Sequence, residues 1–261
     1  MTPEQLTEFF DRLDVWATAR EVPMETLRYG EHADQVLDLH GPRPPDRRPL
    51  LLILHGGFWR PPFTRRNTKA LAVALSDAGW TCANVEYRRL GPGTYRPMLD
   101  DVRRARELLA AFDRAVAVGH SAGGHLALWL AAEGLVDAAL TLGGVCDLAD
   151  GFAARLGDDA VAELLGGSPA EVPHAYALAD PAARLPLGRR QVLVHGTEDD
   201  RVPVDHALRY AERATAAGDD CVVVELDADH FQPINPRSTV WPSVVDAVSS
   251  VSPHLVDEAA R

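Results

Sequence analysis

Cysteine is scarce in this 261-residue chain, and its spacing forms no pattern. The three cysteines, Cys82, Cys146 and Cys221, are odd in number and far apart, and no C-x-x-C pair occurs. We therefore expect small buried thiols rather than a disulfide scaffold or a zinc cluster. The adjacent pair Asp229 and His230 also lacks the clustered spacing of metal ligands, so no metal site is expected.

The chain also lacks long apolar runs and basic tracts. No stretch is long enough to span a membrane, and the acidic N-terminal region does not resemble a signal peptide. A net charge of -12 disfavours nucleic acid and anionic membranes as partners. We therefore expect a cytoplasmic protein whose partner is a small molecule, and the oligomeric state stays open, with a homodimer as one option.

What the chain contains is an alternation of apolar strands and amphipathic helices. Unbroken apolar runs at 50–54 and 138–142 are typical of strands covered on both faces. Alternation of strands and helices at this spacing requires parallel crossovers. The sequence thus predicts one α/β domain over residues 1–261, with a mostly parallel, doubly wound sheet and helices on both faces. Further strands are expected at 25–29, 35–39, 81–85, 191–194 and 221–226, helices at 69–78, 98–112, 204–211 and 240–251, and a proline-rich turn at 41–49.

Two other segments receive separate predictions. A capping box at Thr2 and Gln5, followed by an apolar stripe that includes Leu6 and Phe10, predicts an N-terminal helix packed on the body. Residues 147–187 mix Gly, Pro, Ala and Asp and show one weak helical patch at 160–165. We interpret 147–187 as a small cap or lid inserted over the edge of the sheet, with an ordinary long connection as the alternative.

The stretch Gly119-His120-Ser121-Ala122-Gly123 matches G-x-S-x-G between a short apolar strand and an apolar helix. A serine on such a sharp strand-to-helix bend is strained, and its neighbours must be small. The bend lifts the hydroxyl out of the sheet and directs the Ala122 N–H, at the helix N-terminus, toward developing negative charge. Ser121 is therefore the candidate nucleophile.

A serine nucleophile needs a base, and the base needs an orienting acid. In an open α/β sheet these groups belong at the carboxyl ends of strands. Of the ten histidines, only His230 lies directly after the last predicted strand, so it is the candidate base. The acid is one of the pair Asp199 and Asp200, which follow the preceding strand.

Together, four motifs carry a family resemblance: H-G-G-F-W at 55–59, G-H-S-A-G-G-H-L-A at 119–127, H-G-T-E-D-D-R-V-P at 195–203 and D-H-F at 229–231. In this order they resemble an α/β-hydrolase, and within that superfamily the kynurenine formamidase-like and small carboxylesterase group. The resemblance covers roughly residues 34–250. It implies an α/β-hydrolase fold and assigns the acid to Asp199, with Asp200 as a neighbour that braces the loop or pairs with Arg201.

The resemblance also implies an oxyanion hole. By analogy with H-G-G-G loops, Gly57 and Phe58 donate their N–H groups together with Ala122, although Phe58 stands where the third glycine would be. Trp59, His120 and Phe231 are candidate substrate contacts; packing is the alternative for Trp59 and Phe231, and a structural hydrogen bond for His120. An ion pair at Glu86 to Arg88 is expected to brace the loop from behind.

The predicted function is that of a serine hydrolase that forms an acyl-enzyme and needs no cofactor. The resemblance implies a small carboxylic ester or an N-formyl amide as the substrate, with N-formylkynurenine as the specific case. A general short-chain carboxylesterase is the alternative, and a non-catalytic ligand-binding protein of the hydrolase fold is the alternative from another class. The sequence contains no propeller domain, so large peptides are not expected as substrates.

Overall fold

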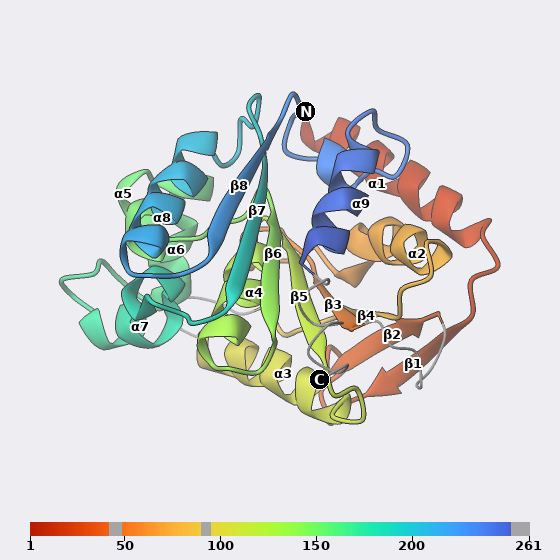
Figure 1. Cartoon of the computed structure of the whole chain (residues 1–261), viewed down its shortest axis with the longest axis horizontal. Helices are drawn as coiled ribbons and strands as arrows, with labels where there is room; N and C mark the ends of the chain where they lie inside the picture. Colours follow the sequence, from red (N-terminus) through yellow and green to blue (C-terminus); the bar gives the residue numbers. More distant parts are fainter. Residues whose placement is uncertain (42–48, 90–94, 252–261) are drawn as a thin grey trace.

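The computed structural model describes residues 1–41, 49–89 and 95–251 (Figure 1). Within them, an eight-stranded sheet has the strand order β1-β2-β4-β3-β5-β6-β7-β8. Strand β2 is antiparallel to β1 and β4, whereas all other neighbouring strands run parallel. The turn expected at 41–49 lies largely outside the described residues. The strands are β1 (Met24–Arg28), β2 (Val36–His40), β3 (Leu50–Leu54), β4 (Cys82–Val85), β5 (Ala115–His120), β6 (Ala138–Leu142), β7 (Arg190–Gly196) and β8 (Cys221–Leu226).

Helices cover both faces of this sheet, which confirms the predicted α/β-hydrolase fold (Figure 1). On one face, α1, α2 and α9 enclose one apolar core, and on the other, α3, α4 and α8 enclose a second. The helices are α1 (Pro3–Thr18), α2 (Lys69–Asp77), α3 (Tyr95–Leu108), α4 (Ala122–Ala132), α5 (Leu148–Ala153), α6 (Leu156–Leu165), α7 (Pro173–Ala179), α8 (Val204–Ala216) and α9 (Trp241–Ser250), with short 3-10 turns η1 (Arg65–Thr68), η2 (Pro181–Arg184) and η3 (Gln232–Ile234).

The unbroken apolar run of β3 follows from these two cores. Leu52 and Leu54 point into the core beneath α3 and α4, whereas Leu51 and Ile53 point into the core beneath α2 and α9. Because successive side chains of a strand face opposite ways, a strand between two helical layers must be apolar at every position. All five residues of β3 are fully buried.

The N-terminal helix forms as the sequence predicts. The Thr2 hydroxyl accepts from the Gln5 N–H and the Gln5 side chain accepts from the Thr2 N–H, which satisfies two donors at the helix start. Its apolar stripe then turns Phe10 and Leu13 inward.

Residues 147–187 contain more helix than the sequence suggested. Helices α5, α6 and α7 and the turn η2 lie here, and their apolar side chains join the core beneath α4 and α8. The Asp147 side chain accepts from the Asp150 N–H at the start of α5, and Asp180 accepts from the Ala182 N–H at the start of η2. Most of this segment is thus part of the packed body.

Candidate active site

Ser121 lies on the sharp bend between β5 and α4, with backbone angles φ 54° and ψ -121°. A non-glycine residue in this conformation is strained, and its surroundings hold it there. A Cβ on Gly119 would lie 2.0 Å from the Gly123 carbonyl oxygen, and a Cβ on Gly123 would lie 2.1 Å from the Leu54 carbonyl oxygen. Both glycines are therefore required, because any side chain at either position would collide with these backbone atoms.

Asp199 and His230 form a buried pair at the ends of adjacent strands β7 and β8. The His230 Nδ1 lies 2.7 Å from Asp199 Oδ2. The other carboxylate oxygen accepts from the N–H groups of Arg201 and Val202, both at 2.9 Å. Burial alone would raise the pKa of Asp199, but the hydrogen bonds from His230 and these backbone donors outweigh it and hold the pKa below its usual value. Asp199 therefore stays ionised and fixes the imidazole orientation.

A glycine that the sequence analysis overlooked makes room for this pair. Gly143 follows β6 with φ +56°, and a Cβ there would lie 2.9 Å from Asp199 Oδ2 and 3.1 Å from His230 Nδ1. Any other residue would press on the hydrogen bond between the two side chains. The signal was present in the sequence, as Gly143-Gly144 directly after an apolar strand.

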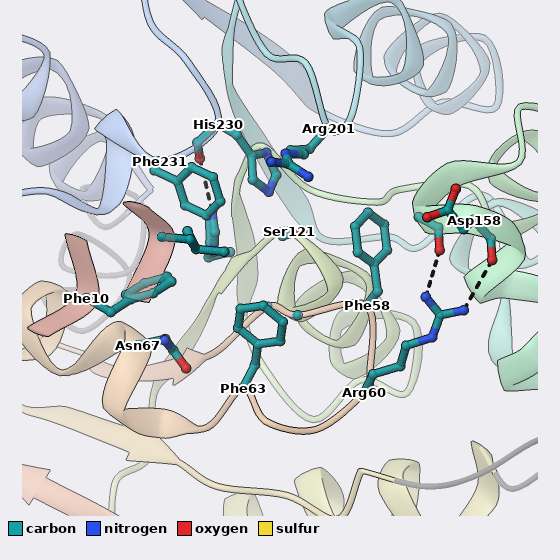
Figure 2. Close-up of a pocket in the computed structure, with 15 residues that line it drawn as sticks. Phe10, Phe58, Arg60, Phe63, Asn67, Ser121, Asp158, Arg201, His230 and Phe231 are labelled. Carbon is teal, nitrogen blue, oxygen red and sulfur yellow. Dashed lines mark hydrogen bonds between the residues drawn. The ribbon is translucent and has the colours of Figure 1, made fainter. Parts of the chain in front are cut away.

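Ser121 and His230 line one cavity of about 220 Å³, with Ser121 at its centre (Figure 2). His120 lines the same cavity and joins the two strand ends, since its Nε2 lies 3.0 Å from the His230 carbonyl oxygen. Burial, with the neighbouring His230 imidazole adding to it, lowers the pKa of His120 to about 3. His120 is therefore neutral and donates Nε2–H to that carbonyl, which supports the structural role considered for it.

The predicted oxyanion loop has an unusual backbone. Three consecutive residues, Gly57, Phe58 and Trp59, have positive φ values of 111°, 49° and 59°. Gly56, Gly57 and Phe58 all line the cavity beside Ser121. Among the described residues, no acceptor takes the N–H of Gly57, Phe58 or Ala122. These donors are thus available to an oxygen atom in the cavity.

Glu86 braces this loop from behind, as expected, but its partners differ from the predicted Arg88. Glu86 Oε1 lies 2.9 Å from His55 Nε2, and Oε2 accepts from the Arg65 N–H at 3.0 Å. Arg89 completes the ion pair, whereas Arg88 pairs with Asp101. Because His55 begins the loop, this buried contact fixes where the loop leaves β3.

Trp59 does not contact the cavity, which corrects its assignment as a candidate substrate contact. Its side chain is 2% exposed and belongs to the core beneath α4, where it meets the His125 ring edge-on at 5.5 Å. The positive φ of Trp59 turns the indole inward, a reversal that the sequence does not reveal. Phe231, in contrast, lines the cavity.

The cavity has two unlike sides (Figure 2). One side is apolar and aromatic, and the other is polar. The apolar side is formed by Leu6, Phe10, Phe63 and Phe231, with Asn67 at its rim, and the polar side by Arg60, Gly157, Asp158 and Arg201. Apart from Phe231, none of these residues was singled out as a site residue from the sequence, because they come from segments far apart in the chain.

The start of α6 is the part of 147–187 that reaches the cavity. Arg60 donates to the carbonyl oxygens of Gly157 at 2.8 Å and Asp158 at 3.2 Å, and it pairs with Glu163 (Figure 2). A Cβ on Gly157 would lie 2.5 Å from the Phe58 ring, so the ring fills the space beside the turn.

Arg201 pairs with Asp200, as expected, and also donates to the Met1 carbonyl oxygen at 3.0 Å.

The fold and the arrangement of Ser121, His230 and Asp199 are of the α/β-hydrolase type. The pattern of the prolyl oligopeptidase family matches residues 78–239, more than half of the chain. The chain therefore belongs to the prolyl oligopeptidase family.

Other comparisons support the fold. The chain is 33% identical over 136 residues to the non-reducing polyketide synthase ausA of Aspergillus calidoustus. This match covers 42% of this chain but only 6% of that protein. Esterase B from Lactobacillus rhamnosis, inhibited by a tributyrin phosphonate, superposes with a TM-score of 0.74 at 18% identity, over 99% of this chain and 98% of that one. A bifunctional GH43-CE protein of Bacteroides eggerthii gives 0.72 at 17% identity, over 88% of this chain and 35% of that one.

Metal sites and membrane-spanning helices are both absent from the described residues. No three His, Cys, Asp or Glu side chains in them gather as a metal site would require. Nor does any helix in that part of the chain combine the length and the apolar character needed to cross a bilayer.

Proposed function

We propose that the protein hydrolyses small carboxylic esters or N-formyl amides through an acyl-enzyme. One observation carries the proposal: a strained Ser121 shares a cavity with His230, which is held by the buried, ionised Asp199. A serine hydroxyl is a weak nucleophile until a base removes its proton, and this arrangement supports that step.

In the first half-reaction, Ser121 Oγ attacks the carbonyl carbon while its proton passes to His230 Nε2. The carbonyl oxygen becomes an oxyanion, stabilised by the N–H groups of Gly57, Phe58 and Ala122. The tetrahedral intermediate collapses, the bond to the leaving oxygen or nitrogen breaks, and His230 gives that atom the proton. A water molecule then attacks the acyl-serine ester with His230 as base, which releases the acid and restores the Ser121 hydroxyl.

The cavity supports a small acyl group. Its volume of about 220 Å³ is below the roughly 300–1,000 Å³ of sites for drug-sized ligands. The leaving group must lie on the His230 side, where it receives its proton, so the acyl group lies on the opposite side, toward Phe58. There the Phe58 ring is packed against Gly157 and leaves little room. Formyl and acetyl groups are thus favoured over long chains and peptides.

The test compares kcat/KM for p-nitrophenyl acetate, butyrate and octanoate and for N-formylkynurenine. We expect rates to fall steeply from acetate to octanoate, with N-formylkynurenine at least equal to the acetate. Strong preference for the aryl esters would remove the formamidase specificity and leave a short-chain carboxylesterase.

Labelling with a fluorophosphonate separates the enzyme from a ligand-binding protein. The wild-type chain should be labelled, and the Ser121→Ala variant should not. A wild-type protein without labelling would refute an activated serine at this position.

A further inference from the structure

The apolar side of the cavity contains phenylalanine rings that contact one another. The Phe10 ring lies 6.0 Å from the Phe231 ring at 87° and 6.5 Å from the Phe63 ring at 76°, both edge-to-face. Phe9 adds a further contact with Phe231 at 5.8 Å. Such edge-to-face pairs hold one another at defined angles, which gives a shaped apolar surface. Figure 2 shows Phe10 and Phe231 on one side of Ser121, with Phe63 below Ser121 between Phe10 and Phe58.

Helix α1 supplies the outer wall of this arrangement. Leu6 and Phe10 come from one face of the helix, and both line the cavity. On the α2 side, Asp14 binds Arg66 at 3.1 Å and Lys69 at 3.0 Å. At its start, the Met1 carbonyl accepts from Arg201. The helix is therefore fixed at its start and near its end, with its middle over the cavity.

The position of this wall relative to His230 assigns it to one part of the substrate. His230 must donate its proton to the departing oxygen or nitrogen, so the leaving group lies on the His230 side of Ser121. Phe231 follows His230 directly, and the two rings lie 5.0 Å apart. The Phe10 ring continues from Phe231, and the Phe63 ring lies beyond Phe10, against Gly57 of the loop.

We infer that Leu6 and Phe10 of helix α1, with Phe63 and Phe231, form a leaving-group subsite for an aromatic alcohol or aromatic amine. This inference rests on the proposed function and adds the chemical class of the leaving group. An aromatic ring fits three phenyl rings set edge-to-face better than a flexible alkyl chain does. Asn67 uses Oδ1 to accept from the Thr64 N–H, and its NH₂ group is the polar donor at the rim of this subsite.

The experiment varies the two halves of the substrate separately in the full-length chain. Benzyl acetate and ethyl acetate differ only in the leaving alcohol, whereas p-nitrophenyl acetate and butyrate differ only in the acyl group. The kcat/KM ratio within each pair is measured for wild type, Leu6→Ala, Phe10→Ala and Phe10→Leu. Val15→Ala is the matched control, since Val15 lies on the same helix, is 70% exposed and is remote from the cavity.

We expect the benzyl-to-ethyl ratio to fall roughly tenfold in Phe10→Ala and less in Leu6→Ala, the range that one apolar contact contributes to discrimination. The acetate-to-butyrate ratio should stay unchanged, and Val15→Ala should match wild type in both. Phe10→Leu keeps an apolar side chain, so the test survives if Phe10→Ala does not fold.

Two results would overturn the inference without touching the proposed function. The first is an unchanged benzyl-to-ethyl ratio in all folded variants, which makes α1 only a packing element. The second is a changed acetate-to-butyrate ratio alone, which assigns the aromatic side to the acyl group. Absence of fluorophosphonate labelling in wild type would instead refute the proposed function itself.

Discussion

Replacing Asp199 by Asn tests the central geometry, because the structure dictates how the amide must sit. One carboxylate oxygen accepts from two backbone N–H groups, of Arg201 and Val202, and the other accepts from His230. In the Asp199→Asn variant only the amide oxygen can accept, so it must face the two backbone donors. The NH₂ group then faces His230 Nδ1 and donates to it.

This reversal places the wrong tautomer next to Ser121. With Nδ1 accepting, the proton of neutral His230 moves to Nε2, which can no longer remove the Ser121 proton. The corresponding change in a serine protease lowers kcat by about 10⁴. A factor of that size is about 5.5 kcal/mol of transition-state stabilisation, at 1.36 kcal/mol for each tenfold. We expect a loss of this order for Asp199→Asn.

The assay is kcat on p-nitrophenyl acetate, with circular dichroism to verify folding. Asp200→Asn is the control: the Asp200 side chain is 67% exposed and pairs with Arg201 at 3.4 Å, so kcat should change by less than about twofold. If Asp199→Asn keeps more than a tenth of the wild-type rate, the tautomer argument is wrong. If Asp200→Asn loses the rate instead, the acid is Asp200.

Three further predictions follow from buried contacts. Gly123→Ala should prevent folding, because the new Cβ would lie 2.1 Å from the Leu54 carbonyl oxygen; soluble, active protein with an unchanged melting temperature would contradict this. Glu86→Gln should weaken the contact with His55 and so misplace the N–H donors of the loop, which should lower kcat by roughly 10–100-fold while KM changes little. A raised KM with an unchanged kcat would instead point to a role in substrate binding. Burial lowers the pKa of His125 to about 4, below its value of about 6.5 in the unfolded chain. Between these two values the unfolded state binds more protons than the folded state, so the free energy of unfolding falls as the pH drops through this range. Urea unfolding should show about 2 kcal/mol less stability from this group at pH 5 than at pH 7, and His125→Gln should remove that difference.

The parallel sheet was predictable because each of its strands has a local signature. The apolar runs at 50–54 and 138–142 match β3 and β6 to the residue, and the strand expected at 221–226 matches the edge strand β8. Burial on both faces makes such runs continuous, and that constraint is visible in a single segment. Antiparallel β2 was predicted one residue early, at 35–39 instead of Val36–His40.

The helices of 147–187 were harder to predict, because they are short and their ends depend on side-chain caps and positive φ values. Arg155, directly before α6, and Asp158 and Asp159, inside its first turn, have positive φ, which no propensity would suggest. The choice between a cavity contact and packing stayed open for Trp59 for the same reason, since a single backbone reversal decides which way the indole points. Local pattern cannot report such reversals.

Ser121, His230 and the pair Asp199 and Asp200 were identifiable as candidates from strand ends, whereas the cavity wall was not. The apolar stripe of α1 predicted burial of Phe10 but not its partner Phe231, more than two hundred residues away. Contacts of that range depend on how the elements pack, which local periodicity does not encode.

The order of the parts along the chain has a consequence for biosynthesis and refolding. Ser121 sits between β5 and α4 in the middle of the sheet, but Asp199 and His230 arrive only with β7 and β8, at the sheet's edge. A nascent chain folded through β6 would hold the hydroxyl without anything to deprotonate it. Return of the proposed ester hydrolysis after denaturation would therefore require docking of the two final strands.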